Sequence, residues 1–462
     1  MSILKIYEVI EKKRIFLCNI ARMEEQATMK RVAFLTLGCK VNFYETEKMM
    51  KQFQNLGFEI VDFSEPSDIY IVNTCTVTNM ADRKSRQMLH RAKKKNPHSL
   101  VVAVGCYVES GAGKLKEDSA VDAFFTNTDK EHIAEHIAEQ FAEQFSPGNR
   151  EAVGSNRDVH HERTRAYIKI QDGCNQFCSY CLIPYVRGKG KLTSLPEEQV
   201  LAEVDELAAK GYKEVVLTGI HLSSYGVDRS EEHSFVKLEG KPLLSLIRRV
   251  SEVPGIRRIR LGSLEPRIIT EAFLQELSNV GKLCPHFHLS LQSGCDTVLG
   301  RMNRHYTTAE YRRKVEMIRT YFDKPALTTD VIVGFPGETE EEFEITRKYL
   351  QELGLSDIHV FPFSPRTGTK AADMPDQVRP EDKKRRADCL IADTEQYRTA
   401  YGDQFKGRTE QVLFEEVTEQ AGQQYLVGHN ERYVKIGVPL ALARERGYGE
   451  NQIHEIRVKY IF

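Results

Sequence analysis

The chain has 462 residues, with 65 Lys and Arg against 66 Asp and Glu, a net charge of −1, and ten cysteines. This length predicts two to four domains with ample cores. The balanced charge excludes recognition of nucleic acid through overall charge, so any such site must be a local patch. No apolar run approaches the roughly 20 residues that a membrane span needs. Ten cysteines without a secretory signal favour metal ligation in a reducing cytoplasm over disulfides, so we expect a cytoplasmic protein.

The amino-terminal part of the sequence divides into an extension and a first α/β region. Residues 1–28 mix apolar and charged positions and lack the uninterrupted apolar core of a signal peptide. A second possible start follows at Met29, so this segment is either a short helical extension or an upstream translation. Residues 29–145 alternate apolar strands with amphipathic helices, which predicts an open parallel sheet. The predicted strands are 32–37, 69–73 and 100–104, and the predicted helices are 44–56 and 83–95.

A second α/β region, residues 165–378, follows a polar linker at residues 146–164. Six apolar segments in it predict six β/α units, which fit a partial barrel better than a closed eight-fold one. The predicted strands are 166–170, 214–217, 258–261, 287–291, 327–333 and 358–361. A charged linker helix at 379–403 then leads to residues 404–462, where short alternating strands and glycines predict a small all-β barrel.

Three cysteines, Cys174, Cys178 and Cys181, occur with C-x3-C-x2-C spacing. A [4Fe–4S] cluster has four irons and usually four thiolate ligands, so three ligands leave one iron open to a small molecule. Enzymes that cleave S-adenosylmethionine to a radical need such an open iron. The triplet resembles the signature of these enzymes. Structural zinc usually has four ligands, often as two C-x2-C pairs, and no second pair follows. A disulfide framework is expected in small secreted domains.

Polar residues follow the other predicted barrel strands. In α/β folds the site lies beyond the carboxyl ends of the strands, and the triplet follows the first strand. We therefore expect a ring of cofactor-binding residues around the triplet: Tyr180, Thr218, Gly219, Ser263, Glu265, Gln292, Asp330 and Gly334. For any single member, a loop-capping or helix-capping role is an equally good explanation.

A second set of cysteines lies in the first α/β region. Cys39, Cys75 and Cys106 each lie just past the carboxyl end of a predicted strand. If those strands are parallel neighbours, three thiols converge on one crevice and form a second cluster site. Free cysteine is often buried as a small apolar residue, so three structural cysteines are the alternative.

Longer motifs around both cysteine sets resemble those of the methylthiotransferases. Thr36-Leu-Gly-Cys-Lys-Val-Asn42, Asn73-Thr-Cys-Thr-Val-Thr78 and Gly105-Cys106 are similar to their amino-terminal domain. Gly173 to Gly188 resembles their radical-SAM signature, and the carboxyl-terminal module resembles their TRAM domain. The first two motifs are most similar to the branch that modifies N6-threonylcarbamoyladenosine at position 37, next to the tRNA anticodon. Cys295 stands where the family commonly has Ser, and we interpret it as a tolerated isostere.

The resemblance implies two [4Fe–4S] clusters and two molecules of S-adenosylmethionine. One, at the Cys174, Cys178 and Cys181 cluster, is cleaved to a radical that takes the hydrogen from C2 of the adenine. A sulfur held at the Cys39, Cys75 and Cys106 cluster is methylated by the second and joins C2. The cofactors supply the radical chemistry, and the protein positions them. The implied partners are the tRNA anticodon loop, a reducing electron-transfer protein and iron–sulfur delivery proteins, and we expect a monomer.

Basic residues in the last two regions are candidates for holding the tRNA. The predicted RNA-binding residues are Lys383, Arg385, Arg432, Lys435, Arg444 and Arg446. The basic helix at 83–95 is a further candidate. Most charge runs are solvated surface, which is the competing explanation for each.

Two other functions remain open from the sequence. A methylthiotransferase of the same architecture could act on isopentenyladenosine in tRNA or on a ribosomal-protein side chain. A non-catalytic RNA-binding protein with structural metal is the alternative from another class.

Overall fold

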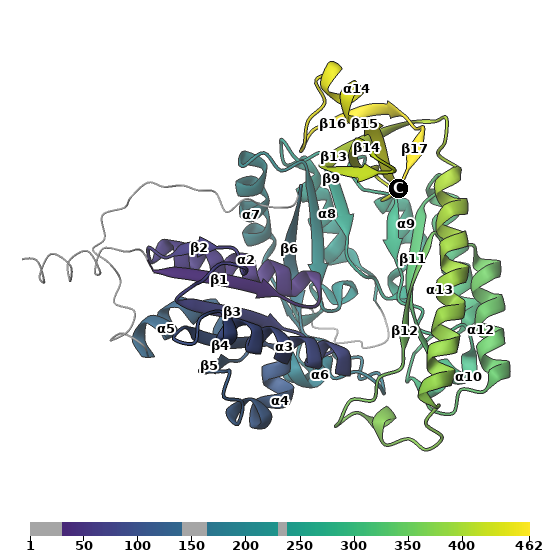
Figure 1. Cartoon of the computed structure of the whole chain (residues 1–462). Coiled ribbons are helices and arrows are strands. Elements are labelled where there is room, and N and C mark those ends of the chain that lie inside the picture. The colour runs from purple at the N-terminus through teal and green to yellow at the C-terminus, as the bar shows by residue number, and fades with distance from the viewer. Residues whose placement is uncertain (1–29, 141–163, 230–237) are drawn as a thin grey trace, which may run out of the picture. The chain divides into compact units, whose positions relative to one another are not determined.

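The computed structural model describes residues 30–140, 164–229 and 238–462 (Figure 1). The predicted extension and nearly all of the predicted linker at 146–164 lie outside these residues. The described chain divides into two compact units, one running to residue 140 and the other from residue 164, with residues 77–79 grouped with the second. Within the described ranges, no helix is both long and apolar enough to cross a membrane.

The first unit is a five-stranded parallel sheet with the order β2-β1-β3-β4-β5. Its strands are β1 Arg31–Thr36, β2 Glu59–Val61, β3 Ile69–Thr74, β4 Leu100–Gly105 and β5 Ala123–Phe125. Its helices are α2 Lys40–Asn55, α3 Asn79–Lys95, α4 Cys106–Lys116, the short η1 Asp129–His132 and α5 Ile133–Gln140. Successive residues of a strand face opposite sides, and along β3 Ile71 belongs to one core whereas Tyr70 and Val72 belong to another. Both faces of the sheet are therefore covered.

The predicted strands of this unit are confirmed, but both predicted helices begin earlier than expected. Helix α3 begins at Asn79, four residues before the predicted start at Arg83. Helix α2 begins at Lys40, four residues before the predicted start at Tyr44. Cys39 has an extended N-cap conformation, and its carbonyl accepts the first helical bond from the Phe43 N–H at 3.2 Å. Residues 40–43 lack the apolar periodicity that predicts a helix. Asn42, for example, donates hydrogen bonds to carbonyls at the ends of two strands.

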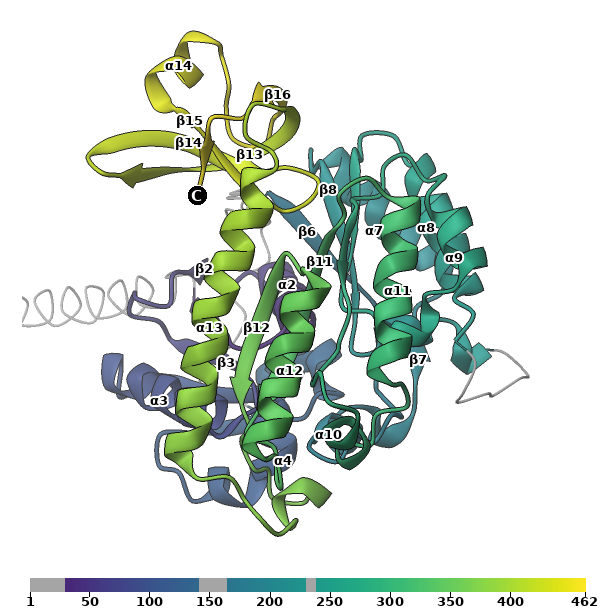
Figure 2. The same cartoon turned by 90° about the vertical axis from the view of Figure 1, so that its right-hand side faces the viewer.

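The second unit contains the predicted partial barrel of six parallel strands (Figure 2). The strands are β6 Arg165–Asp172, β8 Glu214–Gly219, β9 Arg258–Leu261, β10 His286–His288, β11 Ala326–Val333 and β12 Asp357–Pro362. Strands β6, β8 and β9 form one ladder, and β10, β11 and β12 form another. Single parallel bridges, such as Leu264 to Leu289, join the two ladders. No ladder joins β12 to β6 among the described residues, so the barrel is open.

Helices cover the outer side of the barrel strands. They are α7 Glu197–Ala209, α8 Lys241–Glu252, α9 Glu271–Leu277, α10 Asp296–Arg301, α11 Thr308–Tyr321, α12 Glu340–Leu353 and α13 Pro380–Asp403. Both α11 and α12 begin with a capping box, at Thr307 with Glu310 and at Thr339 with Glu342, which fixes where each helix starts. The short helix α6 Ile183–Val186 and strand β7 Thr193–Ser194 follow β6.

The predicted all-β module follows α13 as an antiparallel sheet with the order β16-β13-β14-β15-β17. Its strands are β13 Thr409–Gln420, β14 Gln423–His429, β15 Lys435–Pro439, β16 Ile453–Arg457 and β17 Tyr460–Ile461, with one short helix, α14 Leu440–Glu445. A single apolar core, including Phe405, Phe414 and Ile436, holds the strands together.

The all-β module covers the amino ends of three barrel strands. Tyr433 of the module lies 4.8 Å from the Arg165 guanidinium and 4.9 Å from that of Arg260, measured to the ring centre. Buried Arg260 also pairs with Glu214 through Nε and Oε1 at 2.7 Å. Since Arg165 and Glu214 begin β6 and β8, the module leaves the carboxyl ends of the strands free for a site.

Candidate active site

The loop after β6 carries the first cysteine triplet at the carboxyl end of the barrel. Gly173 opens this loop with φ +78°, and a Cβ there would lie 2.0 Å from a backbone carbonyl oxygen. Only glycine tolerates both conditions. Ser179, which lies between Cys178 and Cys181, donates its N–H to the Met302 carbonyl at 3.0 Å. The segment after α10 therefore anchors the loop from outside.

The triplet combines three half-buried thiols with one nearby cation. Burial raises the pKa of the Cys174 thiol to about 11, and burial together with the neighbouring thiols raises the pKa of Cys181 further. A bound metal removes these protons, because thiolate is the ligand form. The Arg304 guanidinium donates from Nη1 to Cys178 Sγ at 3.2 Å and from Nε to the Tyr306 hydroxyl at 2.9 Å.

This donor set fits an open iron–sulfur cluster. Three thiol donors on one loop match the ligands of such a cluster, and hydrogen bonds to the sulfurs are a known means of tuning it. Each thiolate binds a different iron, so the sulfurs need not lie as close together as the ligands of one ion. In the described ranges, the one group of three His, Cys, Asp or Glu ligand atoms within 4.8 Å of each other is instead His288, Asp330 and His359.

The rim at the end of β8 holds an orphaned polar atom. A Cβ at Gly219 would lie 2.9 Å from Gln171 Oε1, and this oxygen accepts the His221 N–H at 2.7 Å. His221 Nδ1 lies 2.6 Å from Ser224 Oγ, whereas its buried Nε2 has no hydrogen-bond partner within the described chain. Burial lowers the pKa of His221 to about 3, so the imidazole is neutral at physiological pH. A neutral, unpaired imidazole nitrogen beside glycine backbone fits a small polar ligand such as S-adenosylmethionine.

The residues after β9 connect to the triplet loop. Glu265 Oε1 accepts from Arg267 Nε at 2.8 Å, and Arg267 Nη2 donates to Gln176 Oε1 at 2.7 Å. Gln176 lies between Cys174 and Cys178, so Glu265 helps to position the loop. Of the other predicted residues nearby, Ser263 is exposed. Contact of Ser263, Glu265 or Thr218 with a cofactor stays a prediction.

The remaining predicted ring residues lie on the β10 and β11 side. Gln292 has φ +74° and exchanges backbone hydrogen bonds with Asp330 and Ile332, each at 2.9 Å. A Cβ at Gly334 would lie 2.4 Å from the Lys383 side chain, so this glycine is required by the packing of α13. Tyr180 packs edge-on against Phe335, with ring centres 6.4 Å apart. The structure thus brings these positions to one rim, with structural tasks for several of them.

Most of the predicted RNA-binding residues have partners within the second unit. The Lys383 ammonium lies 4.9 Å from the Phe363 ring centre, and Arg385 pairs with Glu340 at 2.6 Å. Arg432 donates to the carbonyls of Asp323 and Lys324, and Lys435 pairs with Glu416 at 2.9 Å. Intramolecular contacts therefore account for these four residues. Arg444 and Arg446 are exposed on and after α14.

The second triplet lies at one edge of the sheet in the first unit. Cys39, Cys75 and Cys106 follow the adjacent strands β1, β3 and β4, which confirms their predicted placement. Gly38, with φ +98°, lies so close to Cys75 that a Cβ there would be 2.9 Å from its Sγ. The Asn127 amide lies 3.8 Å from Cys106 Sγ. The edge thus presents three thiols from three neighbouring strands.

Buried amides hold this edge in shape. Asn42 Nδ2 donates to the Leu37 carbonyl at 2.8 Å and to the Thr74 carbonyl at 3.0 Å, which ties the end of β1 to the end of β3. Asn73 Nδ2 donates to the Asn42 carbonyl at 2.9 Å. The two asparagines of the sequence motifs therefore fix the backbone on which Cys39 and Cys75 lie.

Sequence reasoning missed the residues that reach the first triplet from a distance. Arg304 lies 126 positions from Cys178, and Arg267 lies 91 positions from Gln176. The one signal in the sequence for Arg304 is its place next to the Thr307 helix cap, which says nothing about a thiol. Only the fold brings these cations to the cluster loop.

Two family models match the chain: "Radical SAM superfamily" over residues 168–350 and "Uncharacterized protein family UPF0004" over residues 31–126. The threonylcarbamoyladenosine tRNA methylthiotransferase MtaB of Bacillus subtilis is 39% identical over 88% of this chain and 90% of its own length. The tRNA-2-methylthio-N6-dimethylallyladenosine synthase of Syntrophotalea carbinolica is 33% identical over 84% and 89%. The radical S-adenosylmethionine methyltransferase TsrM from Kitasatospora setae superposes with a TM-score of 0.55 at 16% identity, covering 75% of this chain and 77% of its own, which shows the fold alone.

The open barrel with a three-cysteine loop is that of a radical SAM enzyme, with a [4Fe–4S] cluster and S-adenosylmethionine as its cofactors. The identity over most of both chains carries the assignment further. The chain belongs to the tRNA methylthiotransferase family, whose members are transferases.

Proposed function

We propose that this chain converts N6-threonylcarbamoyladenosine at position 37 of tRNA to its 2-methylthio derivative, using two [4Fe–4S] clusters and two molecules of S-adenosylmethionine. The observation that supports this most directly is the pair of cysteine triplets, each at the carboxyl ends of parallel strands in its own sheet. A relative 39% identical carries the threonylcarbamoyladenosine name. The sequence motifs around Cys39 and Cys75 favour the same branch.

In this proposal Cys174, Cys178 and Cys181 hold one cluster, and Cys39, Cys75 and Cys106 hold the other. When bound, the cofactors supply the radical that activates C2 of the adenine and the methylated sulfur that joins it. The protein's own groups orient and tune. Arg304 donates to the Cys178 sulfur, and His221 offers a neutral nitrogen at the rim. Gln171 accepts the backbone N–H of His221 and so fixes the position of that residue.

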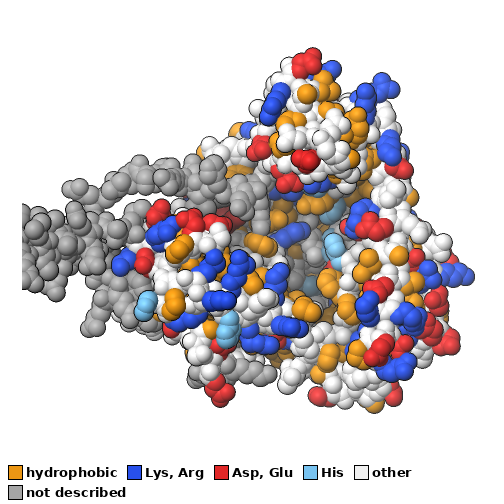
Figure 3. Space-filling model, viewed as in Figure 1, with side chains coloured by type: hydrophobic (Ala, Val, Ile, Leu, Met, Phe, Trp, Pro, Cys, Tyr) orange, Lys and Arg blue, Asp and Glu red, His pale blue; other side chains and the backbone are white. Residues whose placement is uncertain are grey.

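Basic surface is available for the tRNA in the first unit. Helix α3 exposes Arg83, Lys84, Arg91 and Lys94, and Figure 3 shows Lys and Arg side chains gathered over this helix. With Arg444 and Arg446 of the all-β module, these are the cations that we assign to phosphate contacts. A reducing electron-transfer protein and iron–sulfur delivery proteins complete the proposed set of partners.

The test combines nucleoside analysis with cluster counting. Mass spectrometry of tRNA nucleosides from a deletion strain should show loss of the 2-methylthio form of threonylcarbamoyladenosine. If that nucleoside persists, the proposed substrate is wrong. Anaerobic reconstitution should give about eight irons per chain, since two four-iron clusters are expected.

A cysteine variant separates the two clusters. Cys75→Ala should lower the iron content to about four per chain, with S-adenosylmethionine cleavage retained and methylthiolation lost. Cys389→Ala, a half-buried thiol on α13, is the matched control and should keep both activities. Loss of cleavage as well in Cys75→Ala would show that the first unit has only a structural role.

A further inference from the structure

Three polar side chains lie together on the inner face of the barrel. One of them, Asp330, also belongs to the predicted ring of cofactor-binding residues, and the other two do not. His288, Asp330 and His359 come from the adjacent strands β10, β11 and β12. Asp330 and His359 are direct partners in the parallel ladder. His288 Nε2 lies 3.3 Å from Asp330 Oδ2, and the two imidazole rings are stacked with centres 5.7 Å apart. We call this group the lumen trio.

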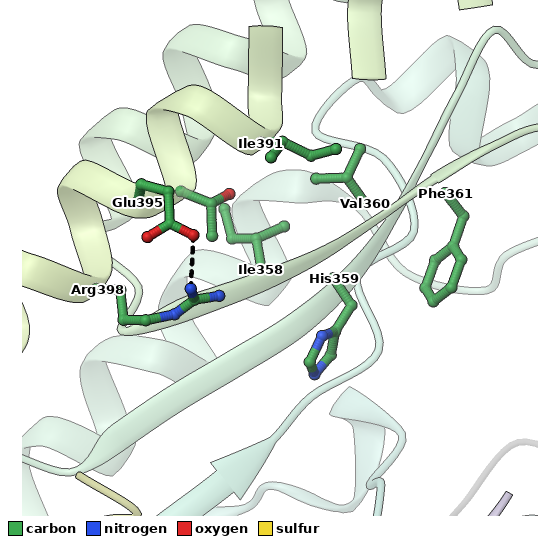
Figure 4. Close-up of a pocket in the computed structure, with 8 residues that line it drawn as sticks. Ile358, His359, Val360, Phe361, Ile391, Glu395 and Arg398 are labelled. Atoms are coloured by element: carbon green, nitrogen blue, oxygen red, sulfur yellow. Dashed lines mark hydrogen bonds and ion pairs between the residues drawn. The ribbon is translucent and has the colours of Figure 1, made fainter. Parts of the chain in front are cut away.

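The trio faces the inside of the barrel. The buried hydroxyl of Thr329, next to Asp330, donates to the Leu289 carbonyl, which also accepts the hydroxyl of Tyr311 on the outer helix α11 at 3.0 Å. Since successive residues of a strand face opposite sides, Asp330 projects to the inner side. In Figure 4, His359 and Phe361 project on one side of β12, and Ile358 and Val360 project on the other, toward α13. Alternate side chains of β12 therefore point either toward helix α13 or toward the inside of the barrel.

Stability alone does not account for the trio. His359 is exposed and, within the described part of the chain, has a ring contact with His288 but no hydrogen bond. The Asp330 side chain is 30% exposed. A structural ion pair inside a barrel would be enclosed and fully bonded, whereas Asp330 and His359 are accessible, and β12 has no ladder partner on its other edge among the described residues.

The trio lies within reach of the cluster loop. The Ser290 carbonyl accepts the Tyr306 hydroxyl at 2.6 Å, and Tyr306 is bonded to Arg304, which donates to Cys178 Sγ. His288 precedes Ser290 by two residues on the same inner face, a step of about 7 Å along a strand. A nucleoside whose reacting carbon is near the cluster can therefore extend a substituent down to the trio.

We infer that the lumen trio binds the polar threonylcarbamoyl substituent of the target nucleoside, an inference that rests on the function proposed above. That substituent carries a carboxylate, a hydroxyl group and amide N–H groups. The imidazole of His359 donates to the carboxylate, and Asp330 accepts from hydroxyl or N–H. His288, whose Nδ1 lies 2.9 Å from Thr328 Oγ1 and whose Nε2 faces Asp330, holds the aspartate in position. Phe361, 43% exposed and two residues beyond His359 on the same face, provides the aromatic surface on which the adenine stacks.

The same chemistry excludes the apolar alternative. A dimethylallyl group, the substituent in the name of other relatives, has no hydrogen-bonding atoms. Placing it against the trio removes water from an aspartate and two histidines without replacing the lost hydrogen bonds, which is costly. Sites built to bind polar groups reject apolar analogues for this reason.

The experiment measures tRNA binding without turnover. The full-length, anaerobically reconstituted protein is titrated, without reductant, with one tRNA carrying threonylcarbamoyladenosine, dimethylallyladenosine or unmodified adenosine at position 37. The wild-type protein should bind the threonylcarbamoyl form about 10–100-fold more tightly than the unmodified form, as expected for hydrogen bonds to charged groups. His359→Phe and Asp330→Asn should each remove most of this difference. Glu395→Gln, on the α13 side of the same pocket, is the control and should preserve it (Figure 4).

The outcomes separate the inference from the function on which it rests. If the wild-type protein does not methylthiolate the threonylcarbamoyl tRNA, the proposed function fails. If it does, but both variants keep the full preference with unchanged iron content and melting temperature, the trio does not read the substituent. One equivalent of a metal other than iron, lost in His359→Phe, would also overturn the inference, because two histidines and a carboxylate are then a metal site.

Discussion

Arg304 is expected to set the reduction potential of the first cluster. Its guanidinium lies 3.2 Å from Cys178 Sγ, and an electron added to the cluster is centred about 6 Å from this charge once a metal–sulfur bond is included. Coulomb's law with an effective dielectric constant of about 20 gives about 3 kcal/mol at that separation. For a one-electron couple this corresponds to about 120 mV. Since a cation stabilises the more negative, reduced cluster, Arg304→Gln should lower the potential by about 100 mV.

The assay is an anaerobic redox titration followed by electron paramagnetic resonance, in a Cys75→Ala background so that one cluster gives the signal. Arg304→Lys is the matched control. It keeps the charge but loses the fixed fork of the guanidinium, so its potential should stay within about 40 mV of the parent. An unchanged potential in Arg304→Gln, with four irons still bound, would refute the electrostatic reasoning and leave Arg304 as a packing residue.

Two further changes test the scaffold. Gly173→Ala should abolish loading of the first cluster, measured as loss of about four irons, because of the left-handed φ and the close carbonyl; Gly211→Ala, also at positive φ but with no atom within 4 Å of the added Cβ, should load normally at a cost of about 1 kcal/mol. Glu214→Gln should lower the free energy of unfolding by about 3–5 kcal/mol in a denaturant titration, because buried Arg260 loses its partner charge. Glu416→Gln, which breaks a more exposed pair, should cost at most about 1 kcal/mol, and equal losses in the two glutamate variants would contradict the burial argument.

Strands with long apolar runs could be predicted from the sequence, and short ones could not. The fully buried run of β3 has no other explanation than a strand covered on both faces. Strand β10 was expected at 287–291 but ends at His288, because the following residues reach their neighbours through single bridges. The strands β2 and β5 have three residues each, and runs of that length carry no periodic signal.

The candidate site was predictable where chemistry follows local spacing. The cysteines could be placed at strand ends because each one follows an apolar run directly. Charged residues were harder, since a sequence does not show their partners. Arg432 was predicted to bind RNA, and the structure shows that it donates to the carbonyls of Lys324 and of Asp323, the latter 109 positions away. Its contact with RNA stays a prediction. Of the lumen trio, the sequence singled out Asp330 alone, since three separate strands must be aligned before His288 and His359 meet.

Tyr433 lies at the amino end of the barrel, so the length of the barrel separates the all-β module from the cluster loop. The all-β module caps the amino ends of β6 and β8, whereas the cysteine loop leaves β6 at its carboxyl end. A strand of this kind advances about 3.3 Å per residue, so some 20–25 Å of barrel separate the two ends. In the function proposed above, RNA bound by the module and a base that reaches the cluster would be held several nucleotides apart, so the enzyme would recognise the folded tRNA rather than a short sequence around one base.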